Sequence, residues 1–216
     1  MNGKLKLLCK IKIFKTLIYN ITYNKYFDIS SLNNMLLIFG KSKIIKDKKS
    51  EIEIYGKAYI GFPMISKFYM GLNYSTLLNI NCNSRLILNN NVRLGPETKI
   101  VVDKGGSIFI GENTYFSAEN KIVCYNNIRI GNNCAISWGV NIMDNDGKSI
   151  DGRNYLGDIN IGDECWIGAG ATILRNTKIG EGSIVAANAV VKGIFPEKCI
   201  IAGNPAKIIK ENISWR

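Results

Sequence analysis

The stretch that most constrains the fold runs from residue 161 to residue 191, where one class of residue returns every six positions. A helix requires a hydrophobic period near 3.6 residues and a simple strand a period of 2, so a period of six fits neither. It indicates a β-solenoid, in which short strands turn a corner every six residues and stack into a prism. The recurring aliphatic residues are Ile161, Ile167, Ile173, Ile179, Val185 and Val191.

A second class of residue keeps the same period. Four positions after each aliphatic residue except the last comes a small side chain, and these are Cys165, Ala171, Thr177, Ser183 and Ala189. We expect both classes to point inward, with the small side chain near a corner where a larger one would not fit. Gly162, Gly168 and Gly180 directly follow aliphatic residues, where a tight corner needs room that a Cβ would deny.

This pattern resembles the hexapeptide-repeat acyltransferases, and the resemblance covers roughly residues 80–212. It implies an all-β fold, the left-handed parallel β-helix. The hand comes from the resemblance alone, because most parallel crossovers are right-handed. We expect a basic N-terminal helical extension and linker over residues 1–50 and the β-helix over residues 51–195. A loop insertion at residues 143–160 and a C-terminal tail with a short helix at residues 196–216 complete the expected organisation.

The N-terminal segment carries most of the charge. Residues 1–50 hold eleven Lys and two Asp, which gives +9 of the net charge of +11. Apolar residues in residues 4–27 recur at helical spacing, so one interpretation of residues 1–27 is a helix that lies on an anionic membrane surface. The other interpretation is a helix packed on its own β-helix or on a second subunit. The nearly neutral repeat region argues against a nucleic-acid groove.

Cysteine usage and composition narrow the remaining classes. The six cysteines include no CxxC pair, and the chain contains no His, which argues against a zinc site or any other metal site. Cys82, Cys124, Cys134 and Cys165 fall at or near inward repeat positions and are interpreted as small core residues. We expect a cytoplasmic protein, at the inner face of the membrane if the N-terminal segment binds lipid.

Three segments make the resemblance more specific. Residues 136–148 (ISWGVNIMDNDGK), 165–174 (CWIGAGATIL) and 202–210 (AGNPAKIIK) are similar to blocks of sugar O-acetyltransferases from surface-polysaccharide clusters. The resemblance implies a homotrimer that binds acetyl-CoA between subunits and transfers its acetyl group to a sugar hydroxyl. It implies an acyl-donor site with Trp166 beside the acetyl group, backbone and small side chains along pantetheine, and a basic end at the nucleotide. The remaining implied donor-site residues are Gly168, Ala169, Ala186, Ala187, Pro205, Lys207 and Lys210.

The chain departs from that family at the catalytic base. The family motif D-x-D-x-H corresponds here to residues 144–148 (DNDGK), so Lys148 stands where the family has its His. A free Lys has a pKa of about 10.4 and is protonated at neutral pH. Three hypotheses remain open. Lys148 is a base with a depressed pKa; or it is a cation that orients the sugar or the oxyanion while Asp144 or Asp146 is a weak base; or catalysis is weak or lost.

The leading functional hypothesis is O-acetylation of a sugar in capsule, O-antigen or other surface-polysaccharide assembly. The acceptor is a nucleotide sugar, a lipid-linked unit or a polysaccharide. A weakly active or inactive β-helix that binds a glycan or an assembly partner is the first alternative. A sugar N-acetyltransferase is the second.

Overall fold

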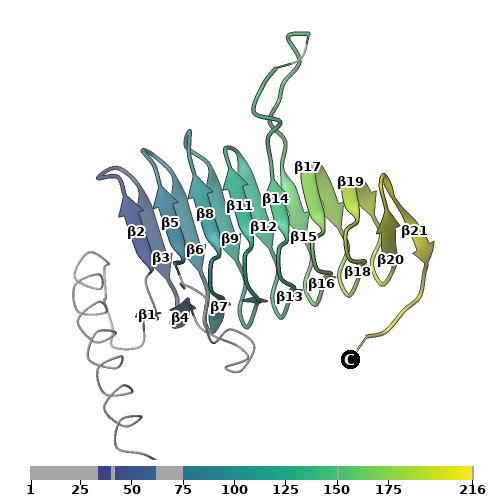
Figure 1. Cartoon of the computed structure of the whole chain (residues 1–216), viewed down its shortest axis with the longest axis horizontal. Helices are drawn as coiled ribbons and strands as arrows, with labels where there is room; N and C mark the ends of the chain where they lie inside the picture. The colour runs from purple at the N-terminus through teal and green to yellow at the C-terminus, as the bar shows by residue number, and fades with distance from the viewer. Residues whose placement is uncertain (1–33, 40–41, 62–74, 150, 216) are drawn as a thin grey trace, which may run out of the picture.

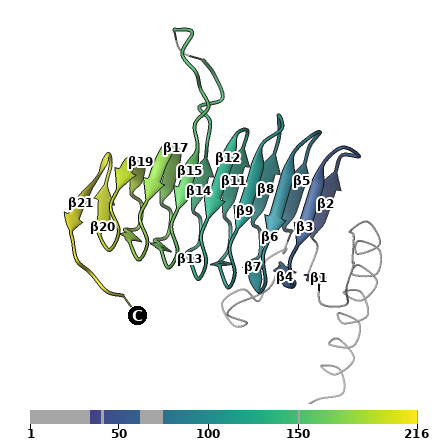
Figure 2. The same cartoon turned by 180° about the vertical axis from the view of Figure 1, so that it is seen from behind.

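The computed structural model describes residues 34–39, 42–61, 75–149 and 151–215. These residues form a solenoid whose coils stack along one axis (Figures 1 and 2). Its strands, in chain order, are β1 (Met35–Ile38), β2 (Lys43–Lys46), β3 (Glu51–Ile54), β4 (Lys57–Ile60), β5 (Leu77–Ile80), β6 (Arg85–Leu88), β7 (Val92–Leu94), β8 (Lys99–Val102), β9 (Ser107–Ile110), β10 (Tyr115–Phe116), β11 (Lys121–Cys124), β12 (Asn127–Ile130), β13 (Ala135–Ile136), β14 (Asn141–Met143), β15 (Ile159–Ile161), β16 (Trp166–Ile167), β17 (Thr172–Ile179), β18 (Ile184–Val185), β19 (Val190–Phe195), β20 (Ile200–Gly203) and β21 (Ala206–Lys210).

The strands make the three faces of a prism. One sheet has the order β1-β4-β7-β10-β13-β16-β18-β20-β21 and forms the first face. The other sheet has twelve strands and covers two faces, because β17 pairs with β14 at one end and with β15 at the other. Among the described strands every pairing is parallel except that of β20 with β21. The predicted all-β parallel helix is therefore confirmed.

The six-residue period places its residues as predicted. Each of the six recurring aliphatic side chains is at most 1% exposed, and each of the five small partners is at most 2% exposed. In the four-residue strands of earlier coils, such as β8 and β9, the second and fourth residues are buried. The core is a dry column of aliphatic side chains that runs the length of the solenoid. Burial at about 25 cal/mol per Å² of apolar surface makes this column the main source of stability.

Glycine is required where one coil approaches the next. A Cβ at Gly168 would lie 2.6 Å from the nitrogen of Ala187, and one at Gly180 would lie 2.3 Å from the nitrogen of Glu197. Gly162 is confined in the same way by Glu181. These contacts are with backbone atoms, which cannot move aside without breaking the coil spacing. The expected role of the corner glycines is confirmed.

The solenoid begins earlier in the chain than predicted. Strands β1 and β2 lie within residues 1–50, where we expected only a helical extension and a linker, and they pair in parallel with β4 and β5. The sequence of β2 resembles a linker because lysines dominate it and no residue of the strand is fully buried. One of its two isoleucines, Ile45, points outward and is 40% exposed. The expected N-terminal helix of residues 4–27 lies outside the described residues.

The C-terminal segment is a strand and not the short helix that we expected. Strand β21 runs antiparallel to β20, with Ile201 opposite Ile208 and Gly203 opposite Ala206. The chain reverses direction at residues 204–205. Strand β21 then pairs with β20, which would otherwise be the edge strand of the first sheet. Because exposed sheet edges invite pairing with other chains, β21 covers an edge that a helix would have left open.

The cysteine prediction is correct except at one position. Cys124, Cys134 and Cys165 are buried, as expected, whereas Cys82 is exposed. Cys82 lies in the turn between β5 and β6, and the inward small residue of that corner is Ser84, which is 1% exposed.

Candidate active site

The small residues that were predicted to line the pantetheine arm lie side by side on one corner of the prism. Ile167 of β16 pairs with Val185 of β18, so the residues that follow these two strands stack in register. We call Gly168, Ala169, Ala186 and Ala187 the small-residue corner. The nitrogen of Gly168 donates to the Val185 oxygen at 2.8 Å, which fixes the separation of the two coils.

The small-residue corner offers a narrow surface of backbone and methyl groups. Gly168 is buried, Ala169 and Ala186 are half-buried, and Ala187 is exposed. Since most ligand sites are concave and apolar with a few polar groups, this corner is suited to one wall of a cleft for a slender chain such as pantetheine. The opposite wall is not supplied by the described residues of the same coil.

Pro205 and Lys207, two of the three residues expected at the nucleotide end, lie next to this corner along the solenoid axis. The pairing of Val185 with Ile201 places Ala202 and Gly203 directly beyond the small-residue corner, and the turn at Pro205 follows. Lys207 lies opposite Ala202 and is exposed. Lys210 lies at the far end of β21, opposite Ile200, so at about 3.3 Å per residue it is roughly 10 Å from Lys207 along the strand.

Trp166 lies on the outer surface of the first face, just before the small-residue corner. It is 42% exposed, and its Nε1 donates to the Ser137 hydroxyl at 3.2 Å. The C-terminal tail returns to this place, because the Trp215 ring lies 5.8 Å from the Trp166 ring and its Nε1 donates to the Glu164 carbonyl at 3.0 Å. Trp215 was not among the predicted site residues, since an isolated Trp near the C-terminus belongs to no repeat.

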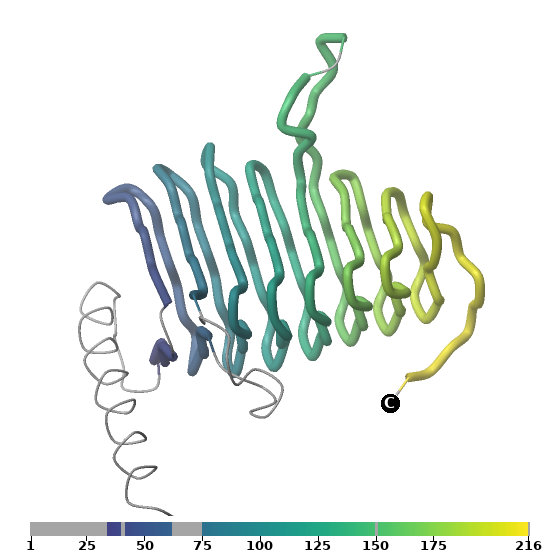
Figure 3. The backbone as a smooth tube through the Cα atoms, in the orientation of Figure 1, coloured from purple at the N-terminus to yellow at the C-terminus, as the bar shows by residue number. Residues whose placement is uncertain are grey.

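The predicted loop is present between β14 and β15. It leaves the solenoid and extends well away from the coils (Figures 1 and 3). Asn145 and Leu156 form an antiparallel bridge near its base. The small-residue corner lies on a different edge of the prism, and β14, a strand of about 10 Å, separates the two edges.

Asp144 is at the root of this loop and is fully buried. Its carboxylate accepts hydrogen bonds from the backbone nitrogens of Tyr125 and Asn126, both at 2.8 Å, and from the Cys124 thiol at 3.2 Å. Burial, reinforced by the Asp144 charge, raises the pKa of the Cys124 thiol, so the sulfur keeps its proton and remains a donor. These contacts favour a structural role for Asp144, because its oxygens face the preceding coil.

The other two candidate catalytic residues lie further along the loop. Asp146 forms an ion pair with Arg175 at 2.5 Å, and its backbone nitrogen donates to the Tyr155 oxygen. Lys148 is exposed, and its ammonium group makes no hydrogen bond or ion pair among the described residues. The structure therefore does not bring Asp144, Asp146 and Lys148 together around one point; Lys148 alone presents an unpaired group to solvent.

Replacing Asp144 with Ala should destabilise the loop root. The change leaves the nitrogens of Tyr125 and Asn126 without their acceptor, and an unsatisfied buried donor costs about 1–3 kcal/mol. We expect a lower midpoint in urea unfolding and faster amide exchange at these two nitrogens. Glu112→Ala, which removes an exposed carboxylate, is the control and should change neither. Equal stability of the two variants would show that the Asp144 contacts contribute nothing.

Within the described ranges of the chain no helix is long and apolar enough to cross a membrane. The same ranges also contain no group of three or more His, Cys, Asp or Glu side chains placed to hold a metal ion.

The chain is similar to known transferases in sequence and in structure. The bacterial transferase hexapeptide family (six repeats) matches residues 158–193. A 24.8 kDa protein in the cps region of Klebsiella pneumoniae is 28% identical over 208 residues, which cover 94% of this chain and 87% of that protein. The putative lipopolysaccharide biosynthesis O-acetyl transferase WbbJ of Escherichia coli K12 is 33% identical over 120 residues, or 49% of this chain and 61% of that protein.

A solved structure supports the same relationship. The polySia specific acetyltransferase NeuO superposes with a TM-score of 0.51 at 26% identity, over 86% of this chain and 90% of that one. The chain spans only 44–61% of the length of several further curated relatives. The repeat match and the shared architecture confirm the left-handed parallel β-helix. Residues 158–193 thus carry the hexapeptide repeat of bacterial transferases, and several proteins to which the chain is similar are acetyltransferases, including the polysialic acid O-acetyltransferase of Escherichia coli O1:K1.

Proposed function

We propose that this protein transfers an acetyl group from acetyl-CoA to a sugar hydroxyl during assembly of a cell-surface polysaccharide. The observation that carries the proposal is the stack of Gly168, Ala169, Ala186 and Ala187 on one corner, which ends at Pro205 and Lys207. A pantetheine arm laid along this corner would place the nucleotide phosphates beside Lys207. The relatives WbbJ and NeuO support a polysaccharide acceptor.

We place acetyl-CoA between two subunits of a homotrimer. The small-residue corner is one wall, and the loop of the same chain leaves a different edge of the prism and points away from it (Figure 1). A loop from a second copy would supply the opposite wall and bring its Lys148 to the acetyl group. Closed three-fold symmetry gives every corner such a partner.

The proposed chemistry follows from this arrangement. The acceptor hydroxyl attacks the thioester carbonyl, its proton passes to a base, and CoA leaves as the thiol or thiolate. Lys148 is the candidate base in its neutral form, or the cation that stabilises the oxyanion in its charged form. Asp146, held by Arg175, orients the loop, and Asp144 fixes its root.

One observation favours a second function, a glycan-binding or assembly scaffold without turnover. The chain has no His, and the Asp144 carboxylate is occupied by buried donors. If Lys148 does not act as a base, the remaining candidate of the predicted catalytic set is Asp146, which is already paired with Arg175.

We also propose that residues 1–27 make peripheral contact with the cytoplasmic face of the membrane. This contact would hold the protein near a lipid-linked acceptor.

A thioester-cleavage assay with a panel of sugars tests the proposed function. CoA release that depends on an added sugar, together with an alkali-labile acetyl ester on that sugar, is the expected result. An alkali-stable amide would instead identify an N-acetyltransferase. Tight CoA binding without release would favour the scaffold.

A substitution at the small-residue corner tests the donor site separately. Ala187→Leu should narrow the cleft and raise the dissociation constant for CoA by about tenfold, a loss near 1.4 kcal/mol. Because Ala187 is exposed, the thermal midpoint should not change. Glu181→Leu, at another corner of the same coil, is the matched control and should bind CoA normally. Unchanged CoA affinity in Ala187→Leu would remove this corner from the donor site.

A further inference from the structure

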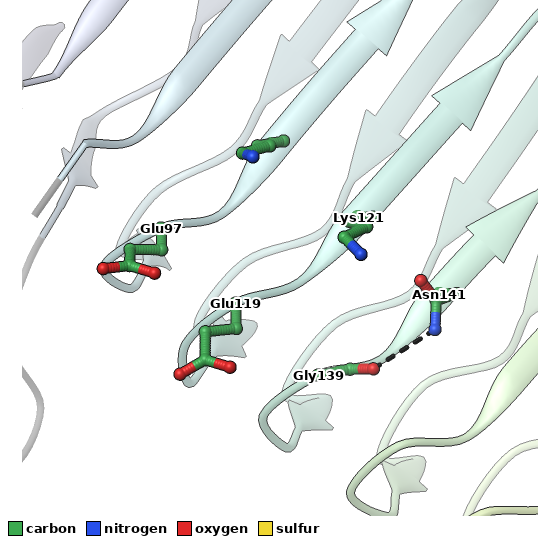
Figure 4. A pocket seen from close by; sticks show the side chains of 6 residues that line it. Glu97, Glu119, Lys121, Gly139 and Asn141 are labelled. Atoms are coloured by element: carbon green, nitrogen blue, oxygen red, sulfur yellow. Dashed lines mark hydrogen bonds between the residues drawn. The ribbon is translucent and has the colours of Figure 1, made fainter.

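Four charged side chains surround a hollow on the same edge of the prism as the small-residue corner. The hollow is lined by Glu97, Lys99, Glu119, Lys121, Gly139 and Asn141. Figure 4 shows the carboxylates of Glu97 and Glu119 at the turns, with Lys121 and Asn141 on the strands that follow. The hollow thus has a row of carboxylates along its corner and a row of ammonium groups along its adjoining face.

The hollow and the small-residue corner are continuous. Strand β13 pairs with β16 on one side and with β10 on the other, so the turn before Gly139 lies one coil from Gly168 and the turn at Glu119 lies two coils away. Parallel strands are about 4.8 Å apart, which puts Glu119 roughly 10 Å from the small-residue corner along the axis. A molecule bound in the hollow would therefore reach towards the end of the proposed donor site.

None of these four side chains forms an ion pair within the described part of the chain. The three ion pairs found there involve Arg85 and Arg175, and none includes a residue of the hollow. Lys99 and Lys121 are moreover direct partners in the pairing of β8 with β11. Like charges directly opposite one another on neighbouring strands repel, so this pair is unfavourable unless an anion lies between them.

We propose that this hollow binds an acceptor sugar chain that carries carboxylate groups. The inference rests on the proposed acetyl transfer and names its substrate class. A sugar carboxylate lies against Lys99 and Lys121 and relieves their repulsion, while sugar hydroxyls donate to Glu97 and Glu119. Neutral and acidic sugars both offer hydroxyl groups to Glu97 and Glu119, but only an acidic sugar also places a carboxylate against Lys99 and Lys121.

Three trisaccharides that differ in charge test the inference. Trigalacturonic acid, maltotriose and the glucosamine trimer are titrated into the CoA-saturated protein at low salt and neutral pH. We expect trigalacturonic acid to bind about tenfold more tightly than maltotriose, because it adds exposed charge contacts with Lys99 and Lys121 that maltotriose lacks. The preference should shrink at high salt, because exposed charges are screened.

Paired variants assign the preference to the hollow. The double change Lys99→Gln and Lys121→Gln should abolish the preference, and Glu97→Gln with Glu119→Gln should weaken binding of acidic and neutral trimers alike. The control Lys57→Gln with Lys178→Gln removes the same charge from two other exposed lysines and should leave the preference intact. Thermal midpoints confirm that each variant is folded.

The outcomes separate this inference from the proposed function. Equal affinity for all three trimers, tighter binding of the glucosamine trimer, or a preference that survives loss of both lysines would overturn the acidic-sugar assignment. So would failure of every trimer to bind while CoA binds normally. Failure of CoA itself to bind would instead remove the proposed acetyl transfer.

Discussion

Ile167→Asp is expected to abolish the folded protein. Ile167 is fully buried in the middle of the aliphatic column, between coils that stack on both sides of it. A carboxylate there has no partner and no water, and its burial costs several kcal/mol. Since a domain is stable by only about 5–15 kcal/mol, most of that margin disappears.

Two control variants make the Ile167 result specific. Ile194 is 82% exposed, so Ile194→Asp makes the same chemical change outside the core and should leave the midpoint almost unchanged. Ile167→Val keeps the core apolar and should cost about 0.5–1.5 kcal/mol. The measurement is the soluble yield and the urea midpoint of each variant. A soluble Ile167→Asp protein with a normal midpoint would show that the six-residue period does not mark the core.

The second large effect is expected at Lys148. An amine acts as a general base only when it is neutral, so a rate that rises with pH is the result expected of an amine base. Lys148→Ala should lower the rate by more than about tenfold, because a general base contributes a factor of about 10²–10⁴. Lys148→His introduces a group with a pKa near 6.5 and should raise the rate at neutral pH.

The pH–rate profile of the Lys148 variants distinguishes the hypotheses. Lys178 is an exposed lysine outside the proposed site, and Lys178→Ala should retain the wild-type profile. If Lys148→Ala and the wild type have equal, pH-independent rates, Lys148 takes no part in proton transfer. Asp146 would then be the carboxylate to test, through Asp146→Asn and its ion-pair partner Arg175.

The core of this protein could be predicted from its sequence because packing in a prism repeats at a fixed interval. Ile161 to Val191 keep that interval without a slip, and each predicted inward side chain is buried. Strand β2 was missed because it contributes few buried residues, so its lysines dominate the pattern. Strand β21 was missed because it lies outside the six-residue repeat and is defined by its antiparallel pairing with β20. The sequence of a five-residue segment does not show which strand it will pair with.

The candidate site could be predicted only in part. The small-residue corner follows from the period, since Gly168 and Ala186 occupy equivalent positions of successive coils. The role of Asp144 does not, because its hydrogen-bond donors lie about eighteen residues earlier and meet it only in the fold. The charged hollow had a signal in the two Glu-x-Lys triplets at 97–99 and 119–121, but their alignment depends on the register of β8 with β11.

Following the acetyl group itself distinguishes acetyl transfer to a sugar from binding of acetyl-CoA without turnover. Protein with acetyl-CoA labelled with ¹³C at the carbonyl is incubated with acidic and neutral oligosaccharides, and the products are identified by NMR and mass spectrometry. We predict a labelled acetyl ester on a sugar oxygen, formed only when protein, acetyl-CoA and sugar are all present and reduced in Ala187→Leu and Lys148→Ala. Bound but unreacted acetyl-CoA, with every sugar recovered unmodified across the pH range, would contradict acetyl transfer by this protein.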